Sequence, residues 1–357
     1  MRKLLASAFV VVLAASTLSA QRVIFTPNGV LPILESYLEA LRVQASIPGM
    51  SAAVVKDGVI IWEKGYGFQN ATARIRATPD TPYMVGDASA ILASALLLQC
   101  VEQRRLDLDR PLGSFGITIP EPQATLRQLL SHTTSAAGAE PFTYVPARYA
   151  QLGAVMEWCA PQPYRKSVSH RILNRLAMRD SVPGTDLINP DLPLPAGLYD
   201  PAELQRYRAV LDRIAVPYRV DMRGRAERTD LPTDTMSAVG GLVSTVRDLA
   251  RLDTAFDERS FLLETTIAEA WQPVMTTRGT AAPTGLGWFV QSYRGQRVVW
   301  HFGMITNAYS SLIVKLPDDR LTFILLANSD RLSSPFQLES GDISRSLFAT
   351  LFLKLVT

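Results

Sequence analysis

The side chains of this chain that could do chemistry form neither of two short motifs that serve serine-based acyl transfer. Six lysines occur, and no serine lies three positions before any of them, so the chain has no Ser-x-x-Lys pair. Such a pair works because side chains three residues apart share one face of a helix, where an amine can reach a hydroxyl. No Gly-x-Ser-x-Gly turn offers another exposed serine. Serine-based acyl transfer therefore has no local signature here.

The histidines do not indicate a metal site either. His132, His170 and His301 are far apart in the sequence, and none has Cys, Asp or Glu partners at the spacing that zinc sites use. We expect no metal and no other cofactor.

The composition is that of a globular protein without a strong electrostatic preference. The chain has 357 residues, of which 47% are hydrophobic and 19% charged, enough for a substantial core and two lobes. Its formal net charge of +3 gives no strong attraction to nucleic acid or to acidic lipid. We expect no nucleic-acid partner.

Residues 1–20 have the pattern of a secretory signal peptide. Two basic residues precede an apolar run from Leu4 to Ala15, and Ala20 supplies the small residue before a cleavage site. The run is too short for a comfortable membrane span, and no second run approaches that length. We expect a protein that lies in the periplasm or outside the cell, with no membrane span after cleavage.

Cys100 and Cys159 are the only cysteines. An exported chain could join them, since two cysteines are the minimum for a disulfide. Cysteine is also among the most often buried small residues, whether or not it is bonded. We favour two buried thiols on helices and keep the disulfide as the alternative.

Strand patterns lie near both ends of the chain, and helical patterns fill the middle. The fold class is therefore α/β (α+β): an antiparallel sheet flanked by N- and C-terminal helices, plus an inserted, mostly helical lobe. We predict an α/β lobe from residues 21–82 and 240–357 and a helical lobe from 83–239. Strands are indicated at 50–55, 58–62, 287–290, 297–300, 309–316 and 321–326, and helices at 31–46, 87–104, 125–131, 147–158, 167–178, 202–214 and 342–355.

Six short segments, each weak alone, occur in an order and at spacings that are specific together. They are residues 47–50, 54–58, 101–109, 125–133, 238–245 and 285–288. In this order they resemble the class C β-lactamases with the related D-alanyl-D-alanine carboxypeptidases and esterases, which share the penicillin-binding-protein fold. The resemblance covers nearly the whole chain and implies a β-lactamase/transpeptidase-like fold.

The serine and lysine of that family open its catalytic helix, and both are missing here. The matching stretch, residues 85–91, puts Asp87 at the serine position and Ala90 at the lysine position. An aspartate at a helix start can accept hydrogen bonds from free amides, worth about 0.5–2 kcal/mol, and alanine is the best helix former. We therefore favour a catalytic site that has become a well-capped helix start.

The family's second motif is Tyr-x-Asn. Its matching residues are Tyr144 and Pro146, and proline lacks the side-chain amide. Tyr144 could equally persist as an aromatic wall. The segment with Ser131 and His132 resembles the family's "HT" segment, which we interpret as structural packing.

The third motif matches His301 and Gly303, and the resemblance implies an oxyanion-hole amide at Met304. His301 could equally persist as a polar residue that its strand needs. By resemblance, the catalytic positions are Asp87, Ala90, Tyr144 and His301, and the substrate-binding positions are Pro146, Phe302, Gly303 and Met304.

Two functions of different kinds follow. The favoured hypothesis is an exported, catalytically inactive pseudoenzyme that binds a peptide, a cell-wall fragment or a protein partner in the old cleft. The alternative is an active hydrolase of esters, amides or β-lactams with a remodelled centre of Asp87, Tyr144 and His301.

Overall fold

The computed structural model describes residues 27–134, 142–160, 162–276 and 278–357. The predicted signal peptide, residues 1–20, lies outside the described residues, so its presence stays a prediction. No helix in the described ranges is long and apolar enough to cross a membrane.

The helices and strands follow the predicted order, with strands near both ends. The helices are α1 Pro27–Gln44, α2 Ala90–Glu102, α3 Leu126–Leu130, α4 Leu152–Cys159, α5 Tyr164–Val168, α6 Pro201–Leu211, α7 Val246–Asp257, α8 Glu264–Ala270 and α9 Leu347–Val356. The strands are β1 Gly49–Lys56, β2 Val59–Asn70, β3 Ile75–Arg76, β4 Tyr83–Met84, β5 Val182–Pro183, β6 Tyr218–Val220, β7 Ala226–Arg228, β8 Leu242–Ser244, β9 Phe289–Tyr293, β10 Gln296–Ile305, β11 Tyr309–Leu316 and β12 Leu321–Ala327.

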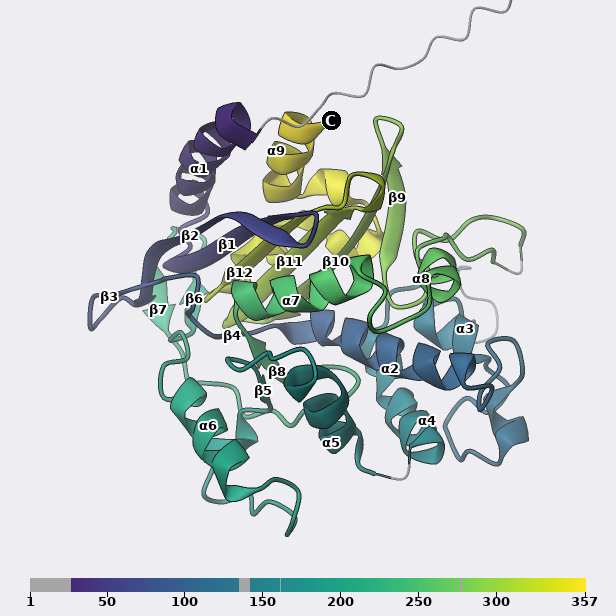
Figure 1. Ribbon diagram of the computed structural model, residues 1–357. Coiled ribbons are helices and arrows are strands. Elements are labelled where there is room, and N and C mark those ends of the chain that lie inside the picture. Colours follow the sequence, from purple (N-terminus) through teal and green to yellow (C-terminus); the bar gives the residue numbers. More distant parts are fainter. Residues whose placement is uncertain (1–26, 135–141, 161, 277) are drawn as a thin grey trace, which may run out of the picture.

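A seven-stranded antiparallel sheet forms the centre of the fold, with the strand order β3-β2-β1-β12-β11-β10-β9. Strands from the two ends of the chain meet where β1 pairs with β12, and Met50 lies opposite Ala327 (Figure 1). This arrangement confirms the predicted mixed fold with its antiparallel sheet. The predicted lobe boundaries at 82/83 and 239/240 stay a prediction.

The two faces of the sheet carry separate cores, because successive strand side chains point to opposite faces. The terminal helices α1 and α9 cover one face, and α7 lies on the other (Figure 1). On the first face, Leu38 and Phe352 pack with Phe323, whose ring stacks on Phe352 at 4.7 Å between centroids. On the second face, Ile324 belongs to the same core as Leu252 of α7.

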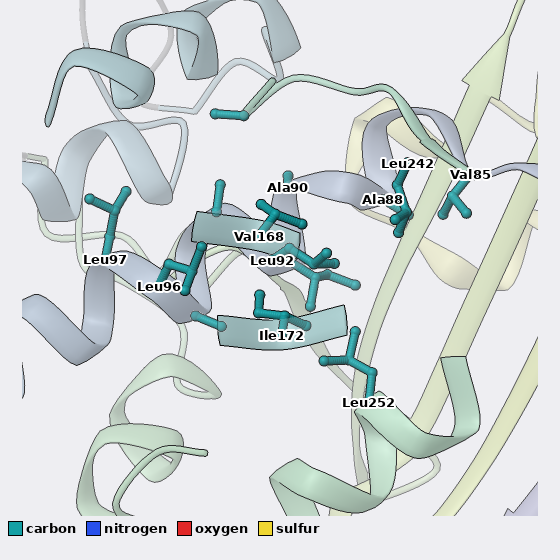
Figure 2. Packing of buried hydrophobic residues seen from close by; sticks show 14 of the residues in the cluster. Val85, Ala88, Ala90, Leu92, Leu96, Leu97, Val168, Ile172, Leu242 and Leu252 are labelled. Carbon is teal, nitrogen blue, oxygen red and sulfur yellow. The ribbon is translucent and has the colours of Figure 1, made fainter. Parts of the chain in front are cut away.

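Helix α2 is apolar on all sides up to Cys100 except for Ser94 and Gln99, which is the pattern of a buried helix. Its residues from Ala90 to Cys100 are all buried. Leu92 and Leu96 pack near Val168 and Ile172 in one continuous cluster (Figure 2).

Cys100 and Cys159 form a disulfide, so the favoured interpretation of two free thiols is wrong, although both residues are buried. The disulfide joins α2 to α4, whose Cα atoms at these positions lie 6.3 Å apart. That separation is within the range that a disulfide can bridge. A sequence separation of 59 residues does not show which helices face each other, so the pattern alone could not decide.

Candidate functional site

The start of α2 lies directly against β10, through a 3₁₀ turn η1 (Gly86–Ser89). Gly86 has φ +65°, and a Cβ there would lie 2.9 Å from the Met304 amide nitrogen. A Cβ on Gly303 would lie 1.9 Å from the Val85 carbonyl oxygen. Only glycine permits this backbone-to-backbone approach. We call this place, η1 with residues 301–305 of β10, the α2–β10 junction.

At the junction β10 continues past the end of its neighbour. β9 pairs with β10 only from Gln296 to Trp300, so residues 301–305 lie at an edge of the main sheet on that side. An edge segment of this kind can pair with an extended ligand. The structure therefore places His301, Phe302, Gly303 and Met304 on a strand end that has no neighbouring strand on that side, with His301 and Phe302 buried and Met304 exposed.

Asp87 lies within η1 and is half-buried. Its carboxylate has no hydrogen-bond partner in the part of the chain that the structure describes, and burial alone raises its pKa to about 7. The predicted cap is therefore wrong. The N-cap residues are Val85 for η1 and Ser89 for α2, and neither side chain makes a capping hydrogen bond. Because the chain enters α2 through a 3₁₀ turn, Asp87 is not at the position from which a side chain caps the helix.

Ala90 opens α2 with only 6% of its surface exposed, inside the apolar cluster (Figure 2). The two nearby serines offer no replacement nucleophile. Ser89 is fully buried and its hydroxyl has no hydrogen-bond partner among the described residues, while Ser94 donates its hydroxyl to the Leu286 carbonyl at 2.7 Å. No described lysine is hydrogen-bonded to any of these groups. The position of the family's lysine is thus a packing position here.

An aromatic cluster borders the junction. The ring of Tyr144 lies 4.6 Å from that of His132 and 6.5 Å from that of His301, centroid to centroid. Phe289 and Phe302 contact the same tyrosine at 5.2 and 5.4 Å. The cluster brings together Tyr144, His301 and Phe302 from the predicted site and adds His132, which we had assigned to packing. In the sequence, the only indication that His132 belongs to this site was its position in the "HT" segment that resembles the family.

Both histidines of the cluster are neutral at pH 7. Burial lowers the pKa of His301 to about 4, and burial with the charge of His301 lowers the pKa of His132 to about 3. His301 Nδ1 lies 2.7 Å from the Phe302 carbonyl oxygen. Since that oxygen can only accept, the proton is on Nδ1, and Nε2 is an acceptor. Burial, reinforced by the charge of Asp87, raises the pKa of Tyr144 well above its usual value, so the phenol keeps its proton.

Pro146 is the first residue of the short helix η3 (Pro146–Gln151), where proline is well tolerated. The following segment is tied to its surroundings by Arg148, which donates to the Thr134 carbonyl at 2.9 Å. Pro146 itself brings no side-chain donor to the site, unlike the asparagine of the family motif. No group of three or more His, Cys, Asp or Glu side chains that could hold a metal ion occurs within the described ranges.

A family model, that of the Beta-lactamase family, matches residues 34–341. This chain belongs to the beta-lactamase family. Protein flp of Staphylococcus aureus (strain MW2) is 20% identical over 338 residues, which cover 83% of this chain and 62% of that protein. The putative penicillin-binding protein PbpX of Bacillus subtilis (strain 168) is 20% identical, over 73% of this chain and 67% of its own length. The chain thus spans about two thirds of these relatives.

Solved structures share the fold at low sequence identity. A penicillin-binding protein homologue from Pyrococcus abyssi has a TM-score of 0.72 at 22% identity, covering 91% of this chain and 77% of that one. The D-amino acid amidase from Ochrobactrum anthropi SV3 has a TM-score of 0.68 at 19% identity, covering 91% and 99%. A beta-lactamase from Sulfitobacter sp. EE-36 has a TM-score of 0.70 at 16% identity, covering 93% and 99%. These likenesses concern the fold.

Proposed function

We propose that this chain is a non-catalytic, exported member of the beta-lactamase family. It binds a peptide, a cell-wall fragment or a protein partner at the α2–β10 junction. One observation carries the proposal: Asp87 and Ala90 stand where the acylating serine and its lysine would be, and Ala90 is packed in the apolar core.

The chemistry of Asp87 argues against acyl transfer. An acyl–aspartate would be an anhydride, and among the described residues no lysine is hydrogen-bonded to Asp87 that could activate water. An ionised carboxylate at this place also repels an oxyanion or a substrate carboxylate, which the family's helix start would attract.

Two further features support binding outside the cytoplasm. The edge segment of β10 suits the addition of an extended peptide, which gains main-chain hydrogen bonds there. The disulfide between Cys100 and Cys159 fits an oxidising compartment, as the signal-peptide pattern of residues 1–20 does.

A second candidate function is hydrolysis through Asp87 as a general base, beside Tyr144 and His301. It is favoured by the raised pKa of Asp87, about 7, because a base with that pKa is well matched to neutral pH. Its substrates would be esters, amides or β-lactams.

Turnover by the purified mature protein separates the two candidates. We expect no hydrolysis of a chromogenic cephalosporin or of p-nitrophenyl esters above an Asp87→Ala control, and no mass increase after incubation with a β-lactam or a fluorophosphonate. Turnover that disappears in the Asp87→Ala variant would establish the second candidate. A covalent adduct on any residue would refute the first.

Cosedimentation with purified peptidoglycan tests the cell-wall option directly. We expect the wild-type protein to bind and a Tyr144→Ala variant to bind less, because Tyr144 borders the junction. Equal binding by both proteins would place the ligand elsewhere.

A further inference from the structure

The first half of β2 is a second open edge of the main sheet, and none of its residues belongs to the α2–β10 junction. On one side, β1 pairs with β2 from Val59 to Gly67. On the other side, β3 pairs only with Phe68 and Asn70. Among the described residues, no strand pairs with residues 59–64 on that side, and their backbone groups bond to no segment other than β1. Because alternate residues of an antiparallel strand direct their N–H and C=O groups to the same side, this edge has free donors and acceptors.

This edge has the sequence of a strand that pairs readily. Residues 59–62 are Val, Ile, Ile and Trp, which are residues favoured in strands. Val59 is 62% exposed, and the next three are half-buried. The two charged residues that follow are already in ion pairs, Glu63 with Arg247 and Lys64 with Glu35. Six residues of strand span about 20 Å, enough to pair with a peptide of similar length.

A cavity of about 660 Å³ lies beside this edge, between the start of β2 and α7. Figure 1 shows α7 alongside the β1–β2 hairpin. Val59, Ile60 and Leu176 give the cavity apolar walls. An added strand would direct every second side chain to the face of the sheet that α7 covers, so that one of them would enter the cavity. The lining residues from α7 and its C-cap recur at spacings that place them on one side of the helix: Arg247, Ala250, Arg251, Thr254 and Glu258.

Glu258 is the charged lining residue that has no ion pair in the described part of the chain. The two lining arginines, Arg247 and Arg251, are each bonded to acids of the protein itself. Glu258 is exposed, and its Oε1 lies 3.9 Å from the position that a Cβ on Gly58 would take, at the start of β2. The cavity therefore combines apolar walls with one available negative charge, which suits an aliphatic side chain next to a basic one.

We propose that residues 59–64 of β2 bind an extended peptide as an eighth strand of the main sheet, with an aliphatic side chain in the cavity and a basic side chain beside Glu258. Main-chain hydrogen bonds to the edge give affinity, and the cavity with its acid selects the sequence. A second copy of this chain fits less well, because the basic residue of its own edge, Lys64, is already held by Glu35. The site is separate from the proposed function and shares no residue with it.

Selection of displayed heptapeptides on the purified wild-type protein tests the proposal. We expect the enriched peptides to contain β-branched residues, an aliphatic residue near a lysine or arginine, and no proline. An enriched peptide labelled with fluorescein should then bind saturably in an anisotropy titration. No enrichment of any peptide would overturn the proposal.

Two N-methylated forms of the same peptide test whether it binds as a strand. Methyl groups on alternate backbone amides remove the donors of one edge only, and the two forms block opposite edges. We expect one form to bind at least about tenfold more weakly than the other, or 1.4 kcal/mol, because a single edge faces β2. Equal affinity of the two forms would overturn strand addition.

Three variants locate the bound peptide. Glu258→Lys and Val59→Glu should each weaken binding at least about tenfold, and both positions are exposed, so the fold should persist. Circular dichroism melting checks this. Glu157→Lys, at an exposed acid of α4, is the matched control and should change the affinity by less than about twofold. Unchanged binding by the folded Glu258→Lys and Val59→Glu proteins would refute the site.

Two further outcomes would give the peptide or the edge another role. Binding that is lost in Tyr144→Ala but kept in Glu258→Lys would place the peptide at the α2–β10 junction, which would overturn this inference and support the proposed function. A dimer in sedimentation velocity that disappears in Val59→Glu would assign the edge to a second copy and overturn the peptide proposal.

Discussion

Two of the regions of this molecule with buried or half-buried carboxylates differ in whether a lysine is present. At the α2–β10 junction, Asp87 has no hydrogen-bond partner in the described part of the chain, and Ala90 occupies the place of the family's lysine. Between α7 and the sheet, Lys315 is nearly fully buried and holds both Asp253 and Asp257. The chain therefore retains a buried lysine, but on β11 rather than on the helix that the family uses for acylation.

The difference shows that the position of a lysine and a carboxylate in the fold decides whether they stabilise the structure or could take part in a reaction. A lysine with three hydrogen-bonded oxygens around it, here those of Asp253, Asp257 and Thr322, is a structural cation, fixed by its partners and unavailable as a base. An unpartnered carboxylate with a raised pKa is a source of instability that only a ligand or a proton can relieve. The first region has lost its catalytic pair, and the second uses a similar pair to hold α7 on the sheet.

The largest expected effect is at Lys315. Lys315→Met leaves two buried carboxylates without a cation, and we expect it to lower the free energy of unfolding by about 3–5 kcal/mol. Urea denaturation measures this change, with the exposed Lys354→Met as the control. A loss below about 1 kcal/mol, as for a surface pair, would mean that the cluster does not hold α7 in place.

Removing the charge of Asp87 should have the opposite effect and raise the free energy of unfolding. Its folded pKa is about 7 against an ordinary 3.8, so the folded state holds its proton longer and loses stability as the pH rises from about 4 to 7. The shift corresponds to at most about 4 kcal/mol, which solvent screening of this half-buried group lowers to about 2.

Asp87→Asn should therefore stabilise the protein at pH 8 and have almost no effect near pH 4. Melting curves across this pH range measure the difference from wild type, and Asp191→Asn, at an exposed acid, is the control. A difference that does not change with pH would show that the pKa of Asp87 is not raised by folding.

The smallest expected effect is the coupling free energy between Asp87 and a lysine introduced at position 90. Ala90→Lys buries an amine and should destabilise the protein, but by about 1–2 kcal/mol less when residue 87 is Asp than when it is Asn, because the new ammonium group then has a partner. A double-mutant cycle of urea unfolding measures this coupling. Zero coupling would mean that the two side chains point apart at the start of α2.

The periodic elements of the fold could be predicted because their signals are local. Leu34 and Leu38 mark α1 at helical spacing, and both are buried. The strands predicted at 50–55 and 58–62 correspond to β1 and β2, which a turn at Asp57 and Gly58 joins, where both residues have positive φ. The start of α2 was predicted less well, because a 3₁₀ turn precedes the helix and leaves Asp87 in a place where it caps nothing.

The sequence by itself determined that no serine stands three residues before a lysine, and that Asp87 and Ala90 fill the serine and lysine positions of the family resemblance. Only the tertiary structure decided that Cys100 and Cys159 are bonded, that His132 meets Tyr144, and that Lys315 is held by two aspartates. The physical reason is the same each time. Covalent neighbours and helical spacing are properties of a short segment, whereas a disulfide, a ring contact or a buried ion pair depends on how distant segments pack, and burial then sets the charge that each group can carry.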